Sequence, residues 1–236
     1  MKDTNGVTAI VSVYNEEQTI KEVVVSLLNC ELIHELIVVN DGSTDNTTKI
    51  LKKLLKSFHY RYIEFEKNVG KSYAMVAGVR NATCNIILFV DGDIIGLNDT
   101  HIGSLLYPLI AKQADMVIGH RFQRKNPGLN IADPLDKWLG GERALFKKDI
   151  YPILNKIEHT KFGIETLMNM YYKNNKKKIT LVDLEGLVHI QKYKKYKIHT
   201  SLVNYTKELF QITKTIMINY LLLFDITRNI IINLFK

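Results

Sequence analysis

The sequence has little cysteine, proline or glycine, and this scarcity excludes several classes of protein. Its 236 residues include 2 Cys, 4 Pro and 13 Gly, too few for a disulfide scaffold or a collagen-like repeat. Cys30 and Cys84 have no C-x-x-C partner and no metal-ligand spacing, so we expect two buried thiols in a reducing cytoplasm. With 46% hydrophobic and 24% charged residues, the composition excludes disorder and predicts a single domain with a continuous core.

Signals for export and membrane insertion are also missing. Residues 1–6 lead directly into the apolar run 7–13, without an apolar segment of signal length. Residues 202–234 have helical periodicity, but the window 216–235 contains Asp225, Arg228 and three Asn, which is too polar for a transmembrane span. We expect a cytoplasmic protein whose amphipathic C-terminal helix packs on the core, forms a homodimer contact or lies on the inner face of a membrane.

Acidic residues are outnumbered, with 24 Asp and Glu against 32 Lys and Arg, and the net charge is +8. The excess is concentrated in residues 171–200, where eight Lys stand against Asp183 and Glu185. Such a segment could contact phosphates of a sugar nucleotide, a lipid headgroup or a nucleic acid, or form an ordinary solvated face. The charge alone does not choose among these partners.

Short apolar strands alternate with amphipathic helices along the first half of the chain, which predicts a mostly parallel α/β sheet with helices on both faces. The expected strands are residues 7–13, 35–39, 60–66 and 85–90, and the expected helices are 16–29, 47–58 and 72–82. The second half is less regular. It predicts helices at 100–113, 148–155 and 163–172, strands at 115–119, 141–146 and 179–189, and a polar loop at 121–137 beside the site.

Acidic side chains stand at the ends of two expected strands. Asp41 follows residues 35–39, and Asp91 and Asp93 follow residues 85–90. Ligands of open α/β sheets bind at the carboxyl ends of the strands. Two carboxylates separated by Gly92 can together bind a hard divalent cation, which could neutralise a departing phosphate. A D-G-D triplet alone remains compatible with a solvated turn.

Six motifs occur in order along about the first 190 residues: YNEE at 14–17, VVNDGSTDNT at 38–47, NVGKSYA at 68–74, LFVDGD at 88–93, GHR at 119–121 and GERAL at 141–145. In this order and spacing the chain resembles the family 2 glycosyltransferases. The resemblance implies a Rossmann-like GT-A fold, a nucleotide-sugar donor and a divalent metal, Mn²⁺ or Mg²⁺. It implies a domain over residues 1–190, with a donor half at 1–95 and an acceptor half at 96–190, followed by a helical extension at 191–236.

The resemblance also implies roles for individual residues. It assigns the nucleoside to Tyr14, Glu16 and Asp41, and the metal and diphosphate to the D-x-D residues Asp91, Gly92 and Asp93. Lys71 follows Gly70 at an expected helix start, where an ammonium and free backbone N–H groups both favour phosphate. Arg121 and Arg143 are expected to contact phosphate or acceptor, because a guanidinium can bind two oxygens at once.

The sequence departs from the family pattern at three positions. Ser12 stands where proline is usual, and Asn40 replaces the first acid of the common D-D-G-S. Ile95 stands where the dolichol-phosphate mannosyltransferase-like branch has a polar metal ligand. His189 resembles the late metal-binding histidine of some GT-A enzymes, so we expect it as a substitute ligand or phosphate contact.

The acceptor side is left with two candidate bases. Transfer to a hydroxyl needs a general base near the anomeric carbon, whereas a phosphate acceptor needs none. Glu165, at an expected helix start, resembles the acceptor-facing acid of related enzymes, and Glu142 is the alternative. With Asp93, these residues form the expected catalytic set.

Competing classes fit the sequence less well. Gly70-Lys71-Ser72 lacks the upstream glycine of a P-loop, because Phe65 stands there, and the first loop lacks the glycines of a nucleotidylyltransferase. We expect a hexosyltransferase that uses a UDP-sugar, or GDP-mannose as second choice, with a polyprenyl phosphate or a small or glycan acceptor and no nucleic-acid partner. The remaining alternative is a non-catalytic nucleotide-sugar-binding or membrane-associated scaffold protein.

Overall fold

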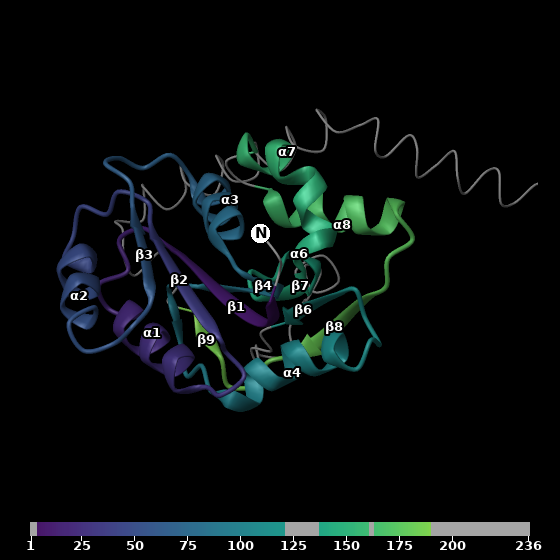
Figure 1. The fold of residues 1–236 in the computed structure, drawn as a ribbon, viewed down its shortest axis with the longest axis horizontal. Coiled ribbons are helices and arrows are strands. Elements are labelled where there is room, and N and C mark those ends of the chain that lie inside the picture. Colours follow the sequence, from purple (N-terminus) through teal and green to yellow (C-terminus); the bar gives the residue numbers. More distant parts are fainter. Residues whose placement is uncertain (1–3, 121–136, 161–162, 190–236) are drawn as a thin grey trace, which may run out of the picture.

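The computed structural model describes residues 4–120, 137–160 and 163–189. Within them, seven strands form one sheet in the order β3-β2-β1-β4-β7-β6-β8 (Figure 1). The strands are β1 (Thr4–Val13), β2 (Glu35–Asn40), β3 (Arg61–Glu64), β4 (Cys84–Asp91), β6 (Met116–His120), β7 (Arg143–Phe146) and β8 (Ile179–Asp183). Only β7 is antiparallel to its neighbours, β4 and β6. The predicted mostly parallel sheet is confirmed.

Helices cover both faces of this sheet, and the alternation of side chains along the strands explains why. In β1, Ala9 and Val11 belong to one buried apolar cluster, while Ile10 between them belongs to the other. Helices α1 (Ile20–Asn29), α2 (Thr47–Leu54) and α4 (Asp99–Ile110) contribute to the first cluster; α3 (Lys71–Asn81), α6 (Lys147–Ile150), α7 (Leu154–Glu158) and α8 (Ile164–Asn174) contribute to the second. Cys30 and Cys84 are free, buried thiols, as predicted.

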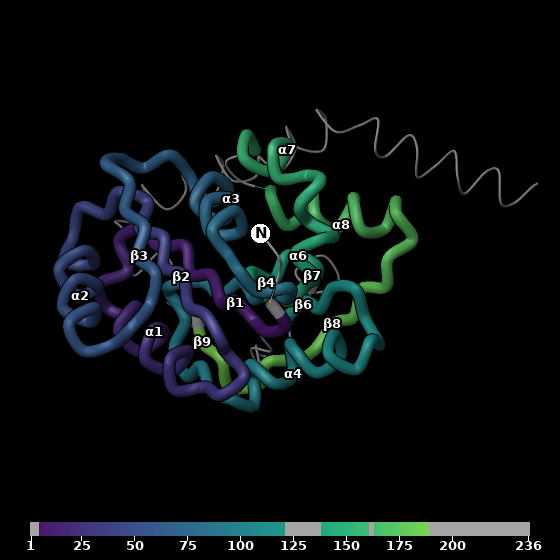
Figure 2. Tube along the Cα trace, in the orientation of Figure 1, coloured from purple at the N-terminus to yellow at the C-terminus, as the bar shows by residue number. Residues whose placement is uncertain are grey.

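The path of the chain separates the two halves of the sheet (Figure 2). The first 91 residues supply the contiguous strands β3, β2, β1 and β4, all parallel. The later strands β7, β6 and β8 extend the sheet from β4. The carboxyl ends of the first four strands therefore share one edge, which carries the candidate site.

The single strand predicted at 179–189 is wrong. The chain forms β8 in the large sheet, turns at Gly186 (φ 84°), and then forms β9 (Val188–His189), which pairs antiparallel with β5 (Ile94–Ile95). Leu184 and Leu187, between the two strands, are buried. An apolar run that fills the core through a turn has the same composition as a continuous buried strand, so periodicity could not distinguish them.

The helix predicted at 148–155 is also interrupted. It consists of α6, a 3-10 turn at Tyr151–Ile153 and then α7. Pro152 lies in this turn, and a proline cannot donate the backbone hydrogen bond that a continuous helix requires. The first helix likewise begins at Ile20 rather than at residue 16, since the preceding residues form the first loop of the site.

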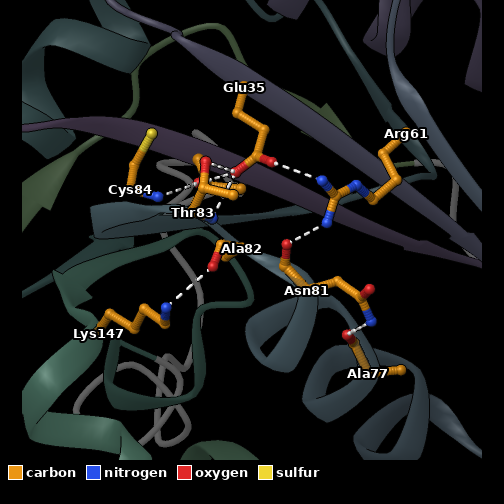
Figure 3. A network of polar contacts seen from close by, with 9 residues as sticks. Glu35, Arg61, Ala77, Asn81, Ala82, Thr83, Cys84 and Lys147 are labelled. Carbon is orange, nitrogen blue, oxygen red and sulfur yellow. Dashed lines mark hydrogen bonds and ion pairs between the residues drawn. The ribbon is translucent and has the colours of Figure 1, made fainter. Parts of the chain in front are cut away.

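A polar network connects the strands near the amino end of β2, opposite the site (Figure 3). Glu35, at the start of β2, accepts hydrogen bonds from Thr8 Oγ1 (2.6 Å) and from the backbone N–H of Thr83 (2.8 Å). Its other oxygen lies 3.6 Å from Arg61, which also donates to the carbonyl of Asn81. One carboxylate thus connects β1, β2, β3 and the loop before β4.

We expect Gly42→Ala to lower the free energy of unfolding by about 3 kcal/mol. Gly42 has φ 67°, and a Cβ there would lie 2.4 Å from the backbone carbon of Lys67. Gly186→Ala is the matched control, because Gly186 has a similarly positive φ of 84° but no atom of the described residues lies within 4 Å of a Cβ placed there. Urea unfolding should show a loss of only about 1 kcal/mol for the control, and equal losses would contradict the close approach to Lys67.

Two predicted elements lie outside the described residues. They are the polar loop at 121–137, apart from its last residue, and the amphipathic helix within 191–236. Among the helices that are described, none has the length and apolar content needed to cross a bilayer.

Candidate active site

Three loops meet where β1, β2 and β4 end. In the register of the sheet, Val13 is opposite Asn40 and Ser12 is opposite Asp91. The segments that begin at Tyr14, Asp41 and Gly92 therefore leave the sheet side by side. This is the edge at which ligands of open α/β sheets bind.

The first loop is fixed to the second by polar contacts. Asn15 adopts a positive φ of 57°, and its side-chain oxygen accepts from the backbone N–H of Thr44 at 2.8 Å. The backbone N–H of Glu16 donates to Thr47 Oγ1 at 2.8 Å. Tyr14 is 39% exposed at this edge, so its ring is accessible to a ligand.

Asp41 ties the end of β2 to the start of α3. Its two carboxylate oxygens accept from the backbone N–H groups of Val69 (2.8 Å) and Gly70 (2.9 Å). Burial raises the pKa of Asp41, and these two hydrogen bonds offset the rise only in part. Because each carboxylate oxygen has a second lone pair, Asp41 can still accept from a ribose or a base.

Stability should depend on pH through Asp41. Its pKa is raised in the folded state, so its charged form destabilises the fold at neutral pH and this penalty disappears as the pH falls through the folded pKa. We expect the free energy of unfolding of the wild type, relative to Asp41→Asn, to increase as the pH falls from 7 toward 4. Urea unfolding at several pH values measures this difference, and a constant or shrinking difference would contradict the assignment.

Lys71 joins two predicted site residues that are far apart in sequence. Its Nζ lies 2.9 Å from Asp91 Oδ1 and 3.1 Å from Glu165 Oε1. Burial by itself lowers the pKa of Lys71, but the two carboxylates outweigh it and the net direction is upward. Lys71 is therefore a cation at every pH near neutrality, and its first-turn position in α3 adds the positive end of the helix.

The D-G-D turn follows β4 directly. Thr19 Oγ1 donates to the carbonyl of Gly92 at 2.7 Å, and a Cβ on Gly92 would lie 3.5 Å from Glu16 Cγ. The side chain of Asp91 is 15% exposed, and Asp93 is 8% exposed. The turn is thus held against the first loop, with both acids at the sheet edge.

These two carboxylates fit a divalent cation. Asp and Glu oxygens are the ligands that Mg²⁺ and Mn²⁺ prefer, and Mg²⁺ is commonly held by one or two carboxylates plus substrate phosphates. No group of three His, Cys, Asp or Glu that could hold a metal occurs among the described side chains. His189 lies opposite Ile94 in the β5–β9 pair, so its backbone is near Asp93, while its side chain lies outside the described part.

The remaining predicted residues lie in different surroundings. Glu142 and Arg143 are both fully buried, and the three guanidinium nitrogens of Arg143 donate to Gly140 O, Trp138 O and Asn169 Oδ1. Glu165 lies in the first turn of α8 (Ile164–Asn174) and contacts Lys71. Arg121 lies outside the described residues.

Two residues that contribute to the site were missed by the sequence analysis. Thr19 anchors the D-G-D turn through Gly92, and Gly141 lies so close to Asp91 that a Cβ would be 2.1 Å from Oδ2. Nothing in the sequence around Thr19 indicates its contact with Gly92. The sequence shows a glycine at the start of the GERAL motif. It does not show that Asp91 lies against this glycine and excludes a larger side chain.

A parallel sheet with loops and acids at its carboxyl edge defines an α/β nucleotide-binding type of domain. The model of the family described as "Glycosyl transferase family 2" matches residues 8–170. The chain therefore belongs to glycosyl transferase family 2, as the six motifs predicted.

Curated relatives match a limited part of the chain. Poly-beta-1,6-N-acetyl-D-glucosamine synthase of Staphylococcus epidermidis is 30% identical over 95 residues, which are 40% of this chain and 23% of the relative. The Staphylococcus aureus protein of the same name is 29% identical over 94 residues. The matched part is thus about a quarter of the length of these relatives.

Solved structures match over a larger part of the fold. Glucosyl-3-phosphoglycerate synthase from Mycobacterium tuberculosis, solved with Mn²⁺, UDP and glucosyl-3-phosphoglycerate, has a TM-score of 0.67 at 20% identity and covers 89% of this chain and 80% of its own. TarS from S. aureus, residues 1–349, has a TM-score of 0.60 at 20% identity, over 75% of this chain and 58% of its own. These similarities confirm the predicted GT-A fold.

Proposed function

We propose that this chain is a metal-dependent glycosyltransferase domain that transfers a hexose from a UDP-sugar to an acceptor. The observation that carries the proposal is the convergence of Asp91, Asp93 and Lys71 beside the loop that Asp41 holds. The structural neighbour described above was solved with Mn²⁺ and UDP, which supports this donor and this class of metal.

The proposed mechanism assigns a task to each of these groups. Asp91 and Asp93 would hold the cation, which when bound would offset the negative charge on the leaving diphosphate. Lys71, in the first turn of α3, contacts the same phosphates, and the positive end of the helix favours them there. Tyr14, Glu16 and Asp41 bind and orient the nucleoside, so that the anomeric carbon faces the acceptor.

Glu165 is the proposed general base for a hydroxyl acceptor. Its carboxylate lies 3.1 Å from the Lys71 ammonium, which also contacts Asp91, so it lies beside the proposed metal site, where a base must act. Glu142 is the weaker candidate because its side chain is fully buried. A small or glycan hydroxyl is therefore preferred to a polyprenyl phosphate, which would need no base; transfer to polyprenyl phosphate at equal rates by wild type and Glu165→Gln would reverse this preference.

Calorimetric titration of the full chain with UDP and with GDP, each with Mn²⁺ and with EDTA, tests the donor site. We expect UDP to bind more tightly with Mn²⁺ than in EDTA, where the proposed nucleoside contacts remain, and GDP to bind at least tenfold more weakly than UDP, about 1.4 kcal/mol. Preference for GDP would assign the donor to the GDP-mannose class. Absence of binding by either nucleotide would contradict the catalytic proposal and leave a non-catalytic scaffold as the better interpretation.

A further inference from the structure

Arg143 is charged, yet its side chain is fully buried at the start of β7. Its Nε donates to Gly140 O at 2.8 Å, Nη2 to Trp138 O at 2.7 Å and Nη1 to Asn169 Oδ1 at 2.7 Å. The amide of Asn169 in turn donates to Trp138 O at 2.7 Å. Two side chains from different elements thus hold the carbonyls of one short segment, residues 138–141.

The 138–141 segment lies directly against the candidate metal acid. A Cβ on Gly141 would lie 2.1 Å from Asp91 Oδ2, and one on Gly140 would lie 2.1 Å from the carbonyl oxygen of Gly119. The segment therefore lies between the ends of β4 and β6, with no space for a side chain at Gly140 or Gly141. A shift of this backbone would change the space available to the Asp91 carboxylate.

A direct phosphate contact by Arg143, expected from the sequence, does not agree with this environment. All three nitrogens already donate to protein acceptors, and the side chain has no exposed surface from which to reach a ligand. Burying a guanidinium is costly unless its donors are satisfied. Burial lowers the pKa of Arg143 to about 10, against the opposing effect of nearby carboxylates that include Glu165 and Asp91, and the side chain remains charged at neutral pH.

We infer that Arg143 is a positioning residue: by holding the 138–141 segment, it fixes Gly141 against Asp91 and so sets the geometry of the first metal-binding carboxylate. This inference rests on the proposed function, in which Asp91 binds the cation. Residues that orient metal ligands without binding the metal themselves typically contribute about 10- to 100-fold to metal affinity.

Two single variants and their combination test this role. Arg143→Lys keeps the charge, but a lysine cannot donate to the three acceptors that the planar guanidinium reaches. Gly141→Ala displaces the Asp91 carboxylate while Arg143 itself stays unchanged. We expect each to weaken Mn²⁺ binding, measured by titration in the presence of UDP, by about tenfold. The double variant should lose little more than either single variant, because both changes act on the same carboxylate. Arg80→Lys is the matched control, since Arg80 pairs with Glu158 at the surface.

UDP binding in EDTA separates the positioning role from a general loss of structure, because a misfolded variant would lose this binding as well. We expect it to be unchanged in all variants, while Mn²⁺ binding falls. Trp138 is the single tryptophan of the chain, so its fluorescence reports on the 138–141 segment, and increased acrylamide quenching is expected for Arg143→Lys but not for Arg80→Lys.

Several outcomes would overturn the inference. Equal loss of UDP affinity with Mn²⁺ and with EDTA would mean that the guanidinium contacts the nucleotide. Mn²⁺ affinity unchanged in both single variants, in a wild type that binds Mn²⁺, would reject the positioning role alone. A wild type that binds no Mn²⁺ would instead reject the proposed function, and this role with it. If Arg143→Lys does not fold, full Mn²⁺ affinity in Gly141→Ala would still overturn the link to Asp91.

Discussion

Asp93→Ala is expected to reduce turnover by about a thousandfold, which corresponds to about 4 kcal/mol of transition-state stabilisation. Asp93 is a nearly buried acid at the end of the D-G-D turn, and removing it leaves Asp91 as the remaining described carboxylate of the turn. A cation with one fewer charged ligand is held more weakly and less well oriented toward the leaving diphosphate. The loss should therefore appear in metal affinity as well as in turnover.

Metal titration of sugar transfer from a UDP-sugar measures both effects. Asp93→Asn should recover a small part of the metal affinity, because an amide oxygen can bind a cation but carries no charge. Asp99→Asn is the control: Asp99 is an exposed acid in the first turn of α4, away from the D-G-D turn. Full metal-dependent activity in Asp93→Ala would reject the assignment of this acid.

The strand-end position of the acids was the part of the site that the sequence could predict. Parallel strands place their carboxyl ends at one edge, so Asp41 and Asp91 were expected at the same edge of the sheet once β2 and β4 were recognised. The helix start after Gly70 was also predicted, since a helix was expected from residue 72 and α3 begins at Lys71. These features depend on local sequence and on the rules of sheet topology.

Contacts between distant segments could not be predicted in the same way. The Lys71–Glu165 contact joins residues 94 positions apart, and it depends on how the tertiary fold brings the first turns of α3 and α8 together. The surroundings of Arg143 show the same limit. An arginine in a family motif suggested a phosphate contact, but the fit of the 138–141 segment, which gives that guanidinium its acceptors, is a tertiary feature with no periodic signal.

The β8–β9 break has a different cause. Leu184 and Leu187 are buried on either side of the turn at Gly186, so hydrophobicity continues where the strand does not. A glycine within an apolar run was the available signal for this turn. The break brings the backbone of His189 beside β5, the strand that follows the D-G-D turn.

Lys71→Met is expected to lower turnover by about a hundredfold and to weaken UDP binding more than uridine binding. The substitution removes the cation that lies within 3.1 Å of both Asp91 and Glu165, and it removes a positive charge from the proposed diphosphate site. Uridine should lose little affinity, because it has no phosphate for the Lys71 ammonium to contact. Calorimetric titration with uridine, UMP and UDP separates these contributions.

The same variant should be less stable by about 2 kcal/mol, the scale of hydrogen bonds to charged groups, and this loss should not change between pH 6 and 9. The raised pKa of Lys71 means that its stabilising effect is fully present below the unfolded-state pKa, about 10.4, and is lost only as the pH rises through the folded pKa. Lys52→Met is the matched control, because Lys52 has one carboxylate partner, Glu64, at an exposed site. A stability loss in Lys71→Met that disappears by pH 8, or equal losses of uridine and UDP affinity, would show that Lys71 does not act as a permanent cation between the donor phosphates and Glu165.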